Sequence, residues 1–303
     1  MRLPDDGRVH PLPPGLGRFP LRHLDDHAGR LPEPWRKRGG VLMPMYQSEA
    51  LWISFHAGHL WSDDYPLAIK IATGKINAVT GENWSTALKR HPQDYVVLPE
   101  QPWLDGFSVE KGRIRQFVAM PLGAGFTAEE QLTGTAEWGG LQLLVYPVRA
   151  EVFERERVER TMFQASLAEA SFCEAMGLAP GGRMRQEVYA DRRSLDDWDQ
   201  RHCARLFATM LNARQWLEVT GERPPHRPPT ALAYTKAGLP WFDYYNADAE
   251  ALDGSETLAA LSGVSDLHAK HGLPLDPADT AELCPTSIRH LGPHEEVVRE
   301  GEP

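Results

Sequence analysis

The amino-acid sequence predicts an α+β protein with a β-sandwich-like core, on which one long helix and several short helices pack. Three observations lead to this fold class. Short segments rich in β-branched and aromatic residues recur between positions 41 and 149, separated by Gly and Pro, with no helical pattern between them. Apolar residues at helical spacing follow between positions 194 and 221. Of the 303 residues, 42% are hydrophobic and nine are Trp, which is enough for a packed core.

The chain begins with a segment that lacks periodicity. Residues 1–40 contain seven Pro and six Gly, so we expect an extended arm there. The β-sandwich-like domain is predicted at 41–149. Its expected strands are 42–55, 67–72, 75–79, 94–98, 107–110, 113–120 and 141–148.

Two β-hairpins are predicted from glycine-containing turns at Thr73-Gly74 and Lys111-Gly112. In the second hairpin we expect Val109 to pair with Ile114. Gln116 then lies on the apolar face, where it must find hydrogen-bond partners or cost about 1 to 3 kcal/mol of stability.

The second half of the chain is predicted to be mainly helical. We expect a charged linker or exposed helix at 150–176, a strand at 183–189 and one long helix from Ser194 to Gly221, opened by a capping box of Ser194 and Asp197. The strand and the long helix belong to a portion of the chain, 177–272, that is expected to pack on the β domain. Shorter helices are expected at 255–261 and 265–270. An acidic, Pro-containing tail, 273–303, ends the chain.

The charge balance argues against nucleic acid as a partner. The net charge is -10, whereas phosphate binding needs a basic surface. Residues 1–40 hold eight Arg or Lys against five acidic residues, and residues 250–303 hold eleven acidic residues against three basic ones. The two ends could pair with each other, pair with a partner, or simply be solvated.

Cysteine usage predicts a cytoplasmic protein. Cys173, Cys203 and Cys284 are odd in number and far apart, as is typical of reduced thiols. No apolar run has the length of a membrane span, so we predict no membrane partner.

Two phrases recur in altered form. Pro102-Trp103-Leu104-Asp105 returns as Pro240-Trp241-Phe242-Asp243, and the sequence GRIRQ at 112–116 returns as GRMRQ at 182–186. Their order along the chain is mirrored, which argues against a tandem repeat.

These phrases contain the residues that we predict to bind a ligand. Alternate arginines on a strand point the same way and could hold a carboxylate or phosphate, or form ordinary cross-strand pairs. A Trp beside a carboxylate could stack a flat ligand, or pack in the core. The predicted ligand-binding residues are Asp94, Gln101, Trp103, Asp105, Arg113, Arg115, Gln116, Arg183, Arg185, Trp241 and Asp243.

Catalytic and cofactor motifs are incomplete. Carboxylates drawn from Glu82, Asp94, Glu100, Asp105 and Glu110 could perform acid and base chemistry across a cleft, as in glycoside hydrolysis. The segment Gly123 to Ala128 resembles a dinucleotide fingerprint only superficially, because Thr127 and Glu130 form a capping box there. We predict no cofactor.

Histidines supply a weak metal alternative. His56 and His59 lie near Asp63 and Asp64, and His268 and His271 lie on adjacent turns of a predicted helix. Neither group has a complete zinc ligand set, so no metal site is predicted.

The segment 92–132, with the phrases PQDYVVLPEQPWLDG and IRQFVAMPLG, resembles a family of bacterial and fungal proteins with no assigned activity. The likeness continues through GGRMRQEVY and LPWFDYY. The resemblance implies that these phrases belong to one shared architecture, and it implies no function.

The leading hypothesis is a non-catalytic binding or assembly protein that uses a Trp, Asp and Arg surface. Its partner would be a small polar ligand or a protein, and the chain could also form a homo-oligomer. The alternative is a carboxylate-dependent hydrolase of a carbohydrate or similar substrate. A histidine-ligated metal protein is a third, weaker hypothesis.

Overall fold

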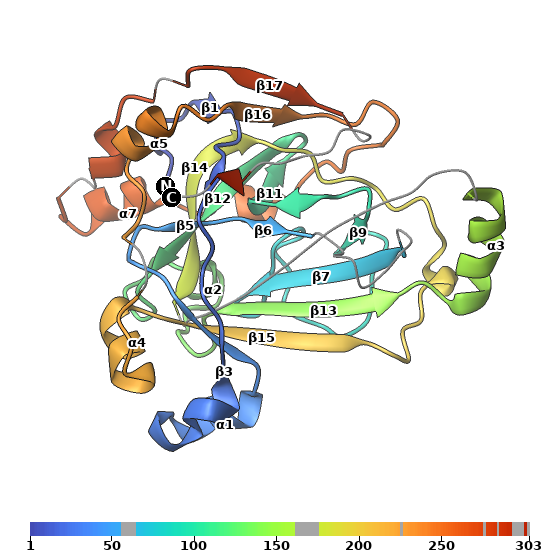
Figure 1. Ribbon diagram of the computed structural model, residues 1–303, viewed down its shortest axis with the longest axis horizontal. Coiled ribbons are helices and arrows are strands. Elements are labelled where there is room, and N and C mark those ends of the chain that lie inside the picture. The colour runs from blue at the N-terminus through green and yellow to red at the C-terminus, as the bar shows by residue number, and fades with distance from the viewer. Residues whose placement is uncertain are drawn as a thin grey trace.

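The computed structural model describes residues 1–55, 65–160, 176–224, 227–274, 277–283, 285–292 and 300–301. Within them the fold is mixed α/β, with several sheets and short helices (Figure 1). None of the helices in these ranges has the length and apolar character needed to cross a bilayer.

The larger sheet has seven strands in the order β3-β4-β15-β13-β7-β8, and β9 also pairs with β7. Its centre is antiparallel, because β13 runs antiparallel to both β15 and β7, whereas β4 is parallel to β15. The strands are β3 (Arg22–His23), β4 (Val41–Pro44), β7 (Leu67–Thr73), β8 (Ile76–Asn77), β9 (Val96–Leu98), β13 (Leu141–Pro147) and β15 (Ala204–Leu211).

A five-stranded sheet has the order β1-β14-β12-β11, and β5 also pairs with β12. β12 runs antiparallel to β11, β14 and β5, and β1 is parallel to β14. The strands are β1 (Val9–His10), β5 (Ala50–Leu51), β11 (Gly106–Glu110), β12 (Arg113–Met120) and β14 (Gly177–Arg185).

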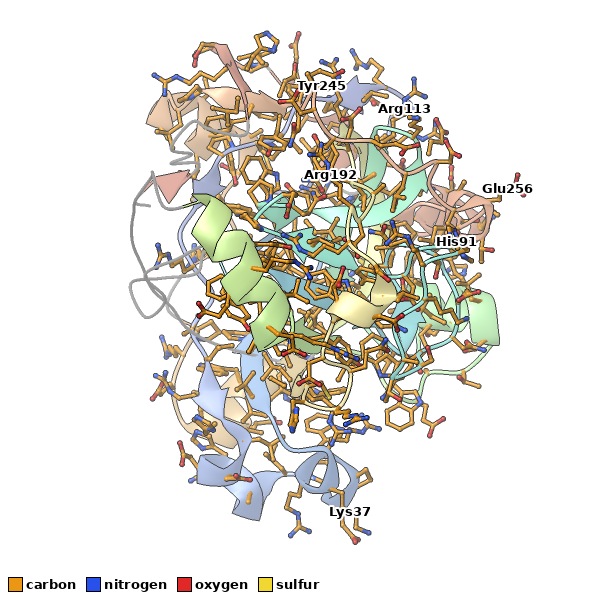
Figure 2. The ribbon with its side chains drawn as sticks, turned by 90° about the vertical axis from the view of Figure 1, so that its right-hand side faces the viewer. Lys37, His91, Arg113, Arg192, Tyr245 and Glu256 are labelled. Carbon is orange, nitrogen blue, oxygen red and sulfur yellow. The ribbon has the colours of Figure 1, made fainter. Side chains whose placement is uncertain are left out.

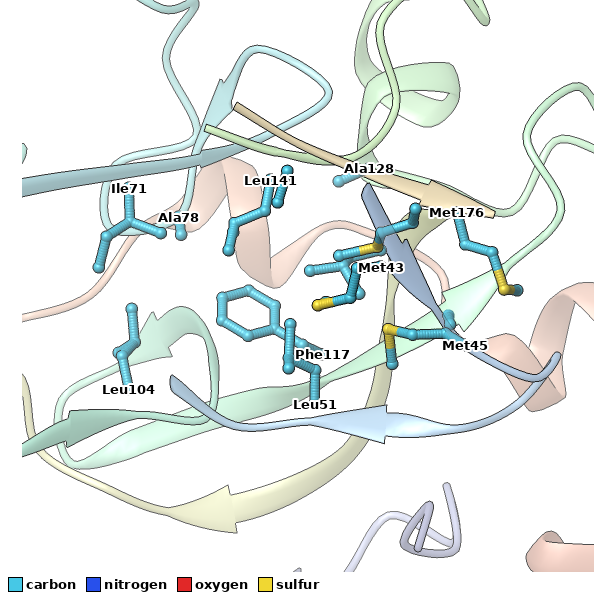
Figure 3. Close-up of a cluster of buried hydrophobic side chains, with 14 of the residues drawn as sticks. Met43, Met45, Leu51, Ile71, Ala78, Leu104, Phe117, Ala128, Leu141 and Met176 are labelled. Atoms are coloured by element: carbon cyan, nitrogen blue, oxygen red, sulfur yellow. The ribbon is translucent and has the colours of Figure 1, made fainter. Parts of the chain in front are cut away.

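The two larger sheets contribute to one buried hydrophobic cluster. Figure 3 shows Ile71 and Leu141 of the seven-stranded sheet facing Leu51 and Phe117 of the five-stranded sheet. Burial of apolar surface between sheets is the main favourable contribution to folding. This shared core fixes the position of β12 and β14, which carry the recurrent arginine phrases.

Three two-stranded sheets complete the β structure, and one of them joins the two ends of the chain. β18 (Glu300–Gly301) pairs with β2 (Gly15–Leu16), and the Arg2 guanidinium forms a buried ion pair with Asp279. Pairing of the basic and acidic ends is one of the outcomes that their charges allow. The other two sheets are β6 (Ile53–Ser54) with β10 (Trp103–Leu104), and β16 (Trp241–Tyr244) with β17 (Ile288–Leu291).

The described helices are all short. The α-helices are α1 (Glu33–Arg38), α2 (Ala128–Thr133), α3 (Ala150–Arg160), α4 (Ala213–Thr220), α5 (Ala231–Ala237), α6 (Glu256–Ala259) and α7 (Val264–Lys270), and the 3₁₀ helices are η1 (Leu24–Arg30), η2 (Leu195–Asp197) and η3 (Pro277–Thr280).

The prediction of one long helix from Ser194 to Gly221 is wrong. The predicted capping box exists, but it opens only the 3₁₀ helix η2, and β15 and α4 follow as separate elements. β15 lies between β4 and β13 and is buried on both faces over most of its length, so its apolar residues are nearly continuous. Such a run fits helical spacing as well as a strand does. The predicted helix end at Gly221 is correct, because this glycine ends α4, in the left-handed conformation.

Two local expectations near β12 and β14 also need correction. In the second hairpin, Ser108 rather than Val109 pairs with Ile114, because β11 has an irregularity between Ser108 and Glu110. The strand predicted at 183–189 lies nearer the N-terminus, because β14 begins at Gly177 and ends at Arg185. A Cβ atom on Gly182 would lie 2.4 Å from the carbonyl oxygen of Pro4, so this glycine permits close packing rather than a turn.

Candidate functional site

The two arginine phrases lie side by side in the five-stranded sheet. In the antiparallel pairing of β12 with β14, Arg113 lies across from Arg185 and Arg115 lies across from Arg183. Residues directly across from each other share one face of a sheet, so four arginines occupy one face. The mirrored order of the phrases along the chain is compatible with this antiparallel pairing.

The two Trp-Asp phrases also meet. Trp103 and Trp241 belong to one buried cluster, and the Trp103 ring lies 5.1 Å from the Tyr244 ring in an edge-on arrangement. Both indoles are almost fully buried, at 1% and 4% exposure. These tryptophans therefore pack in the core, and neither presents an open face for stacking a ligand.

Most of the predicted ligand-binding residues are buried. Arg113 and Arg185 are exposed and Arg183 is partly exposed. The buried ones are Asp94, Gln101, Trp103, Asp105, Arg115, Gln116, Trp241 and Asp243.

The buried carboxylates have partners within the chain. Asp94 accepts a hydrogen bond of 2.5 Å from the Lys70 ammonium group. Asp105 accepts one of 3.1 Å from the Gln186 side chain, whose oxygen accepts from the Asp105 backbone at 3.0 Å. These contacts satisfy buried polar groups, as folding alone requires.

The buried glutamines connect segments that no strand pairing joins. Gln101 donates to the Glu187 carbonyl at 3.2 Å and accepts from the Tyr189 backbone at 3.2 Å. Gln116 accepts from the Leu3 backbone at 2.8 Å and donates to the Met1 carbonyl at 3.2 Å. The expectation that Gln116 finds hydrogen-bond partners is confirmed.

Arg115 holds the N-terminal segment against the sheet. Its guanidinium donates to both carboxylate oxygens of Asp5 at 3.0 Å and to the carbonyl oxygens of Gly181 and Leu261. Burial raises the pKa of Asp5, and the charge of Arg115 opposes that rise. Asp5 belongs to neither of the recurrent phrases, so the sequence alone did not identify it as the partner of Arg115.

The exposed arginines form weaker ion pairs. Arg113 lies 2.8 Å from Glu110, and Arg185 lies 2.7 Å from Asp243, whose carboxylate is also 3.8 Å from His290. Arg113 and Arg185 are 47% and 58% exposed in their side chains. Figure 2 shows Arg113 and Tyr245 at the same end of the molecule.

We call this region the arginine surface. Sequence reasoning missed its three members outside the arginine phrases, because they come from β17 and from the residue after β16, with no shared motif. Ile288 on β17 and Tyr245, which follows β16, are exposed large side chains. Asp243 of β16 lies across from His290 of β17. The arginine surface comprises Arg113, Arg183, Arg185, Tyr245, Ile288 and His290.

Most of the carboxylates proposed for hydrolysis are paired with cations. Besides Asp94 with Lys70, Glu82 lies 2.7 Å from Lys89, Glu110 lies 2.8 Å from Arg113 and Glu100 lies 3.6 Å from Arg193. Asp105 accepts a hydrogen bond from Gln186. Such partners stabilise the charged form of an acid, which is unfavourable for a proton donor. At Asp94 burial outweighs this effect and raises the pKa of the carboxyl group.

The metal candidates divide into two groups. His56, His59, Asp63 and Asp64 lie outside the described residues. His268 is buried in α7, with its ring 5.2 Å from that of Phe126, and His271 lies 5.2 Å from the same ring. Among the described residues, no three His, Cys, Asp or Glu side chains are grouped so that they could hold a metal ion.

Comparison with known proteins adds no identification: no family model, curated protein or solved structure matches this chain. The geometry of the described residues therefore carries the functional argument.

Proposed function

We propose that this protein is a non-catalytic binding protein, built on a β-sandwich-like core, whose arginine surface holds an acidic segment of a protein partner. The observation that carries the proposal is the direct opposition of Arg113 to Arg185 and of Arg115 to Arg183. Like charges directly opposite on neighbouring strands are destabilising, and a partner's carboxylates would offset that repulsion.

The exposed guanidinium groups can exchange their carboxylate partners within the chain for carboxylates of another protein. Ion pairs as exposed as those of Arg113 with Glu110 contribute at most about 1 kcal/mol. Arg113 and Arg185 can therefore transfer to a partner's carboxylates, which arginine grips in a bidentate manner. Arg183 has no carboxylate partner among the described residues and adds a further positive charge.

Apolar side chains beside the arginines favour a protein partner over a free small anion. Tyr245 and Ile288 are 62% and 45% exposed. Arginine and tyrosine are the residue types most enriched where protein partners bind strongly. The proposal includes a cytoplasmic location, supported by the free and exposed thiol of Cys203.

The other two hypotheses have less support. A carboxylate-dependent hydrolase would need Asp94 or Asp105 at a cleft, and both are buried and bonded within the chain. A histidine-ligated metal site rests on His56 and His59, which lie outside the described residues.

Binding of fluorescein-labelled polyglutamate, followed by fluorescence anisotropy, tests the proposal. We expect saturable binding that weakens at least about tenfold in the double variant Arg113→Gln, Arg185→Gln, because each lost charge-assisted hydrogen bond is worth about 1.5 kcal/mol or more. Rising salt should weaken it too. Lys236→Gln on α5 replaces an exposed cation that is not part of the arginine surface and is the matched control. Equal affinity of the double variant and the wild-type protein would overturn the proposal, as would absence of wild-type binding.

A further inference from the structure

A second group of cations lies on the outer face of the seven-stranded sheet, away from the arginine surface. The ammonium group of Lys75 lies 5.8 Å from the centre of the Trp84 ring and 4.8 Å from that of Trp138. The guanidinium of Arg38 lies 4.5 Å from Trp138 and 5.5 Å from Phe207. We call these five alternating side chains the cation–aromatic ladder.

Hydrogen bonds to the backbone hold the Trp138 end of the ladder in place. The buried carboxylate of Glu129 accepts from the backbone of Glu137 at 2.9 Å, Trp138 at 2.8 Å and Gly139 at 2.7 Å. Arg38 donates to the carbonyl oxygens of Trp138 and Glu137. The loop before β13 is therefore ordered around Trp138.

The Lys75 end is equally well defined. The backbone N–H of Lys75 donates to the Gln142 side chain at 2.8 Å, and the Trp84 backbone donates to the Lys75 carbonyl at 2.9 Å. Lys75 has a φ of 65°, a left-handed conformation that costs a residue with a side chain of this size stability. A glycine would remove that strain, so the lysine side chain at this turn has a role that the turn itself does not supply.

Part of the positive charge at the ladder has no direct carboxylate partner. Arg205 is exposed on β15, two residues before Phe207, and therefore lies on the same face of the sheet as Phe207. Its positive charge repels that of Lys75. Burial, followed by the charges of Arg205 and Arg38, lowers the pKa of Lys75. Burial also lowers the pKa of Arg38, and the negative charges of Glu137 and Glu129 oppose that change. Within the described part of the chain, no carboxylate lies within ion-pair distance of Lys75 or Arg205.

We propose that Lys75 and Arg205 bind the oxyanion group of a small molecule, a carboxylate or a phosphate, beside the cation–aromatic ladder. The indole rings of Trp84 and Trp138 hold the Lys75 ammonium group between them and limit its freedom. Arg205 supplies a planar donor that matches either oxyanion. An anion here would relieve the repulsion among Lys75, Arg38 and Arg205.

The ligand is small because the protein as a whole is acidic. The net charge of -10 repels an extended polyanion such as nucleic acid, whereas a single oxyanion interacts mainly with the nearest cations. The proposed site shares no residue with the arginine surface, so an experiment can contradict one of the two proposals without affecting the other.

Indole N–H resonances of the nine tryptophans provide the test. Trp84→Phe and Trp138→Phe assign the two ladder resonances, and the protein is titrated with inorganic phosphate in one arm and succinate in the other. We expect these two resonances to shift saturably while the core tryptophans do not. The arm with the lower Kd identifies the oxyanion as a phosphate or a carboxylate.

Charge-removing variants complete the experiment. Lys75→Gln and Arg205→Gln should each raise the Kd by about tenfold, whereas Lys236→Gln should leave it unchanged. Arg205 is exposed, so its replacement leaves the core intact and decides the outcome even if Lys75→Gln perturbs the turn. The proposal is wrong if neither anion shifts the ladder resonances saturably, or if Arg205→Gln binds as tightly as the wild-type protein.

Discussion

Lys70 and Asp94 form an ion pair of 2.5 Å that is almost completely shielded from solvent, with side chains 1% and 2% exposed. The ammonium group also donates to the hydroxyl of Ser85 and the carbonyl of Ala87, so its three N–H groups are all used. Full hydrogen bonding is what makes a buried charge tolerable in the interior.

Breaking this pair from one side should be strongly destabilising. Lys70→Met leaves Asp94 buried and without its counterion, and we expect a loss of about 3 to 5 kcal/mol in the free energy of unfolding measured in urea. Lys70→Met combined with Asp94→Asn should recover part of that loss, because no charge then stays buried. A double variant as unstable as the sum of both single variants would contradict this explanation.

Trp103 should behave as a core residue and not as a binding residue. Trp103→Ala removes a side chain that is 1% exposed, and we expect it to cost about 3 to 5 kcal/mol of stability. Tyr245→Ala removes an aromatic ring that is 62% exposed and should change stability by less than about 0.5 kcal/mol. Thermal unfolding of both variants measures the contrast, and similar melting temperatures would show that Trp103 is not needed for the core.

The sequence predicted the strands and hairpins best where the signal is local. Gly74 and Gly112 both adopt positive φ values, which glycine reaches freely. The turn predicted at Lys111-Gly112 is present, whereas the turn predicted at Thr73-Gly74 lies one residue later, at Gly74-Lys75. β15 was mistaken for helix because its two buried faces remove the alternation that identifies a strand. The register of β11 depends on an irregularity that local sequence does not encode.

The candidate site was predictable only in part. The arginine phrases meet because β12 and β14 are antiparallel neighbours, and their mirrored order is compatible with that pairing. Nothing local to Trp103 or Arg115 distinguishes a buried residue from a ligand-binding one, since both uses need the same residue types. The cation–aromatic ladder was missed because its members come from separate segments of the chain with no common spacing.

Gly106 should tolerate no side chain. A Cβ atom at this position would lie 2.0 Å from the carbonyl oxygen of Arg115 on the paired strand, well inside van der Waals contact. Gly106→Ala therefore has to separate β11 from β12, and we expect a loss of several kcal/mol or failure to fold. Gly29→Ala, where an added Cβ meets nothing within 4 Å, is the matched control and should stay close to wild-type stability. Soluble yield and urea denaturation distinguish the two variants.

High pH should unfold the protein through its buried tyrosines. Burial raises the pKa of Tyr146 to about 12 and that of Tyr244 to about 12. Burial also raises the pKa of Tyr95, whose hydroxyl donates to Asp191 at 2.7 Å. In the unfolded chain a tyrosine ionises near pH 10, so between pH 10 and these higher values the unfolded state has lost protons that the folded state retains.

The stabilising contribution of these tyrosines is therefore complete below pH 10 and is lost as the pH rises towards 12. We expect the free energy of unfolding to fall by up to about 1.4 kcal/mol per pH unit for each tyrosine, since one pKa unit corresponds to that energy. Urea denaturation at several pH values gives the slope, and absorbance at 295 nm shows whether tyrosinate appears together with unfolding. Tyr146→Phe should reduce the slope of the free energy of unfolding against pH by the contribution of one ionising group, because phenylalanine cannot ionise. If Tyr146→Phe leaves the 295 nm absorbance change on unfolding as large as in the wild-type protein, Tyr146 already ionises in the folded state and the explanation is wrong.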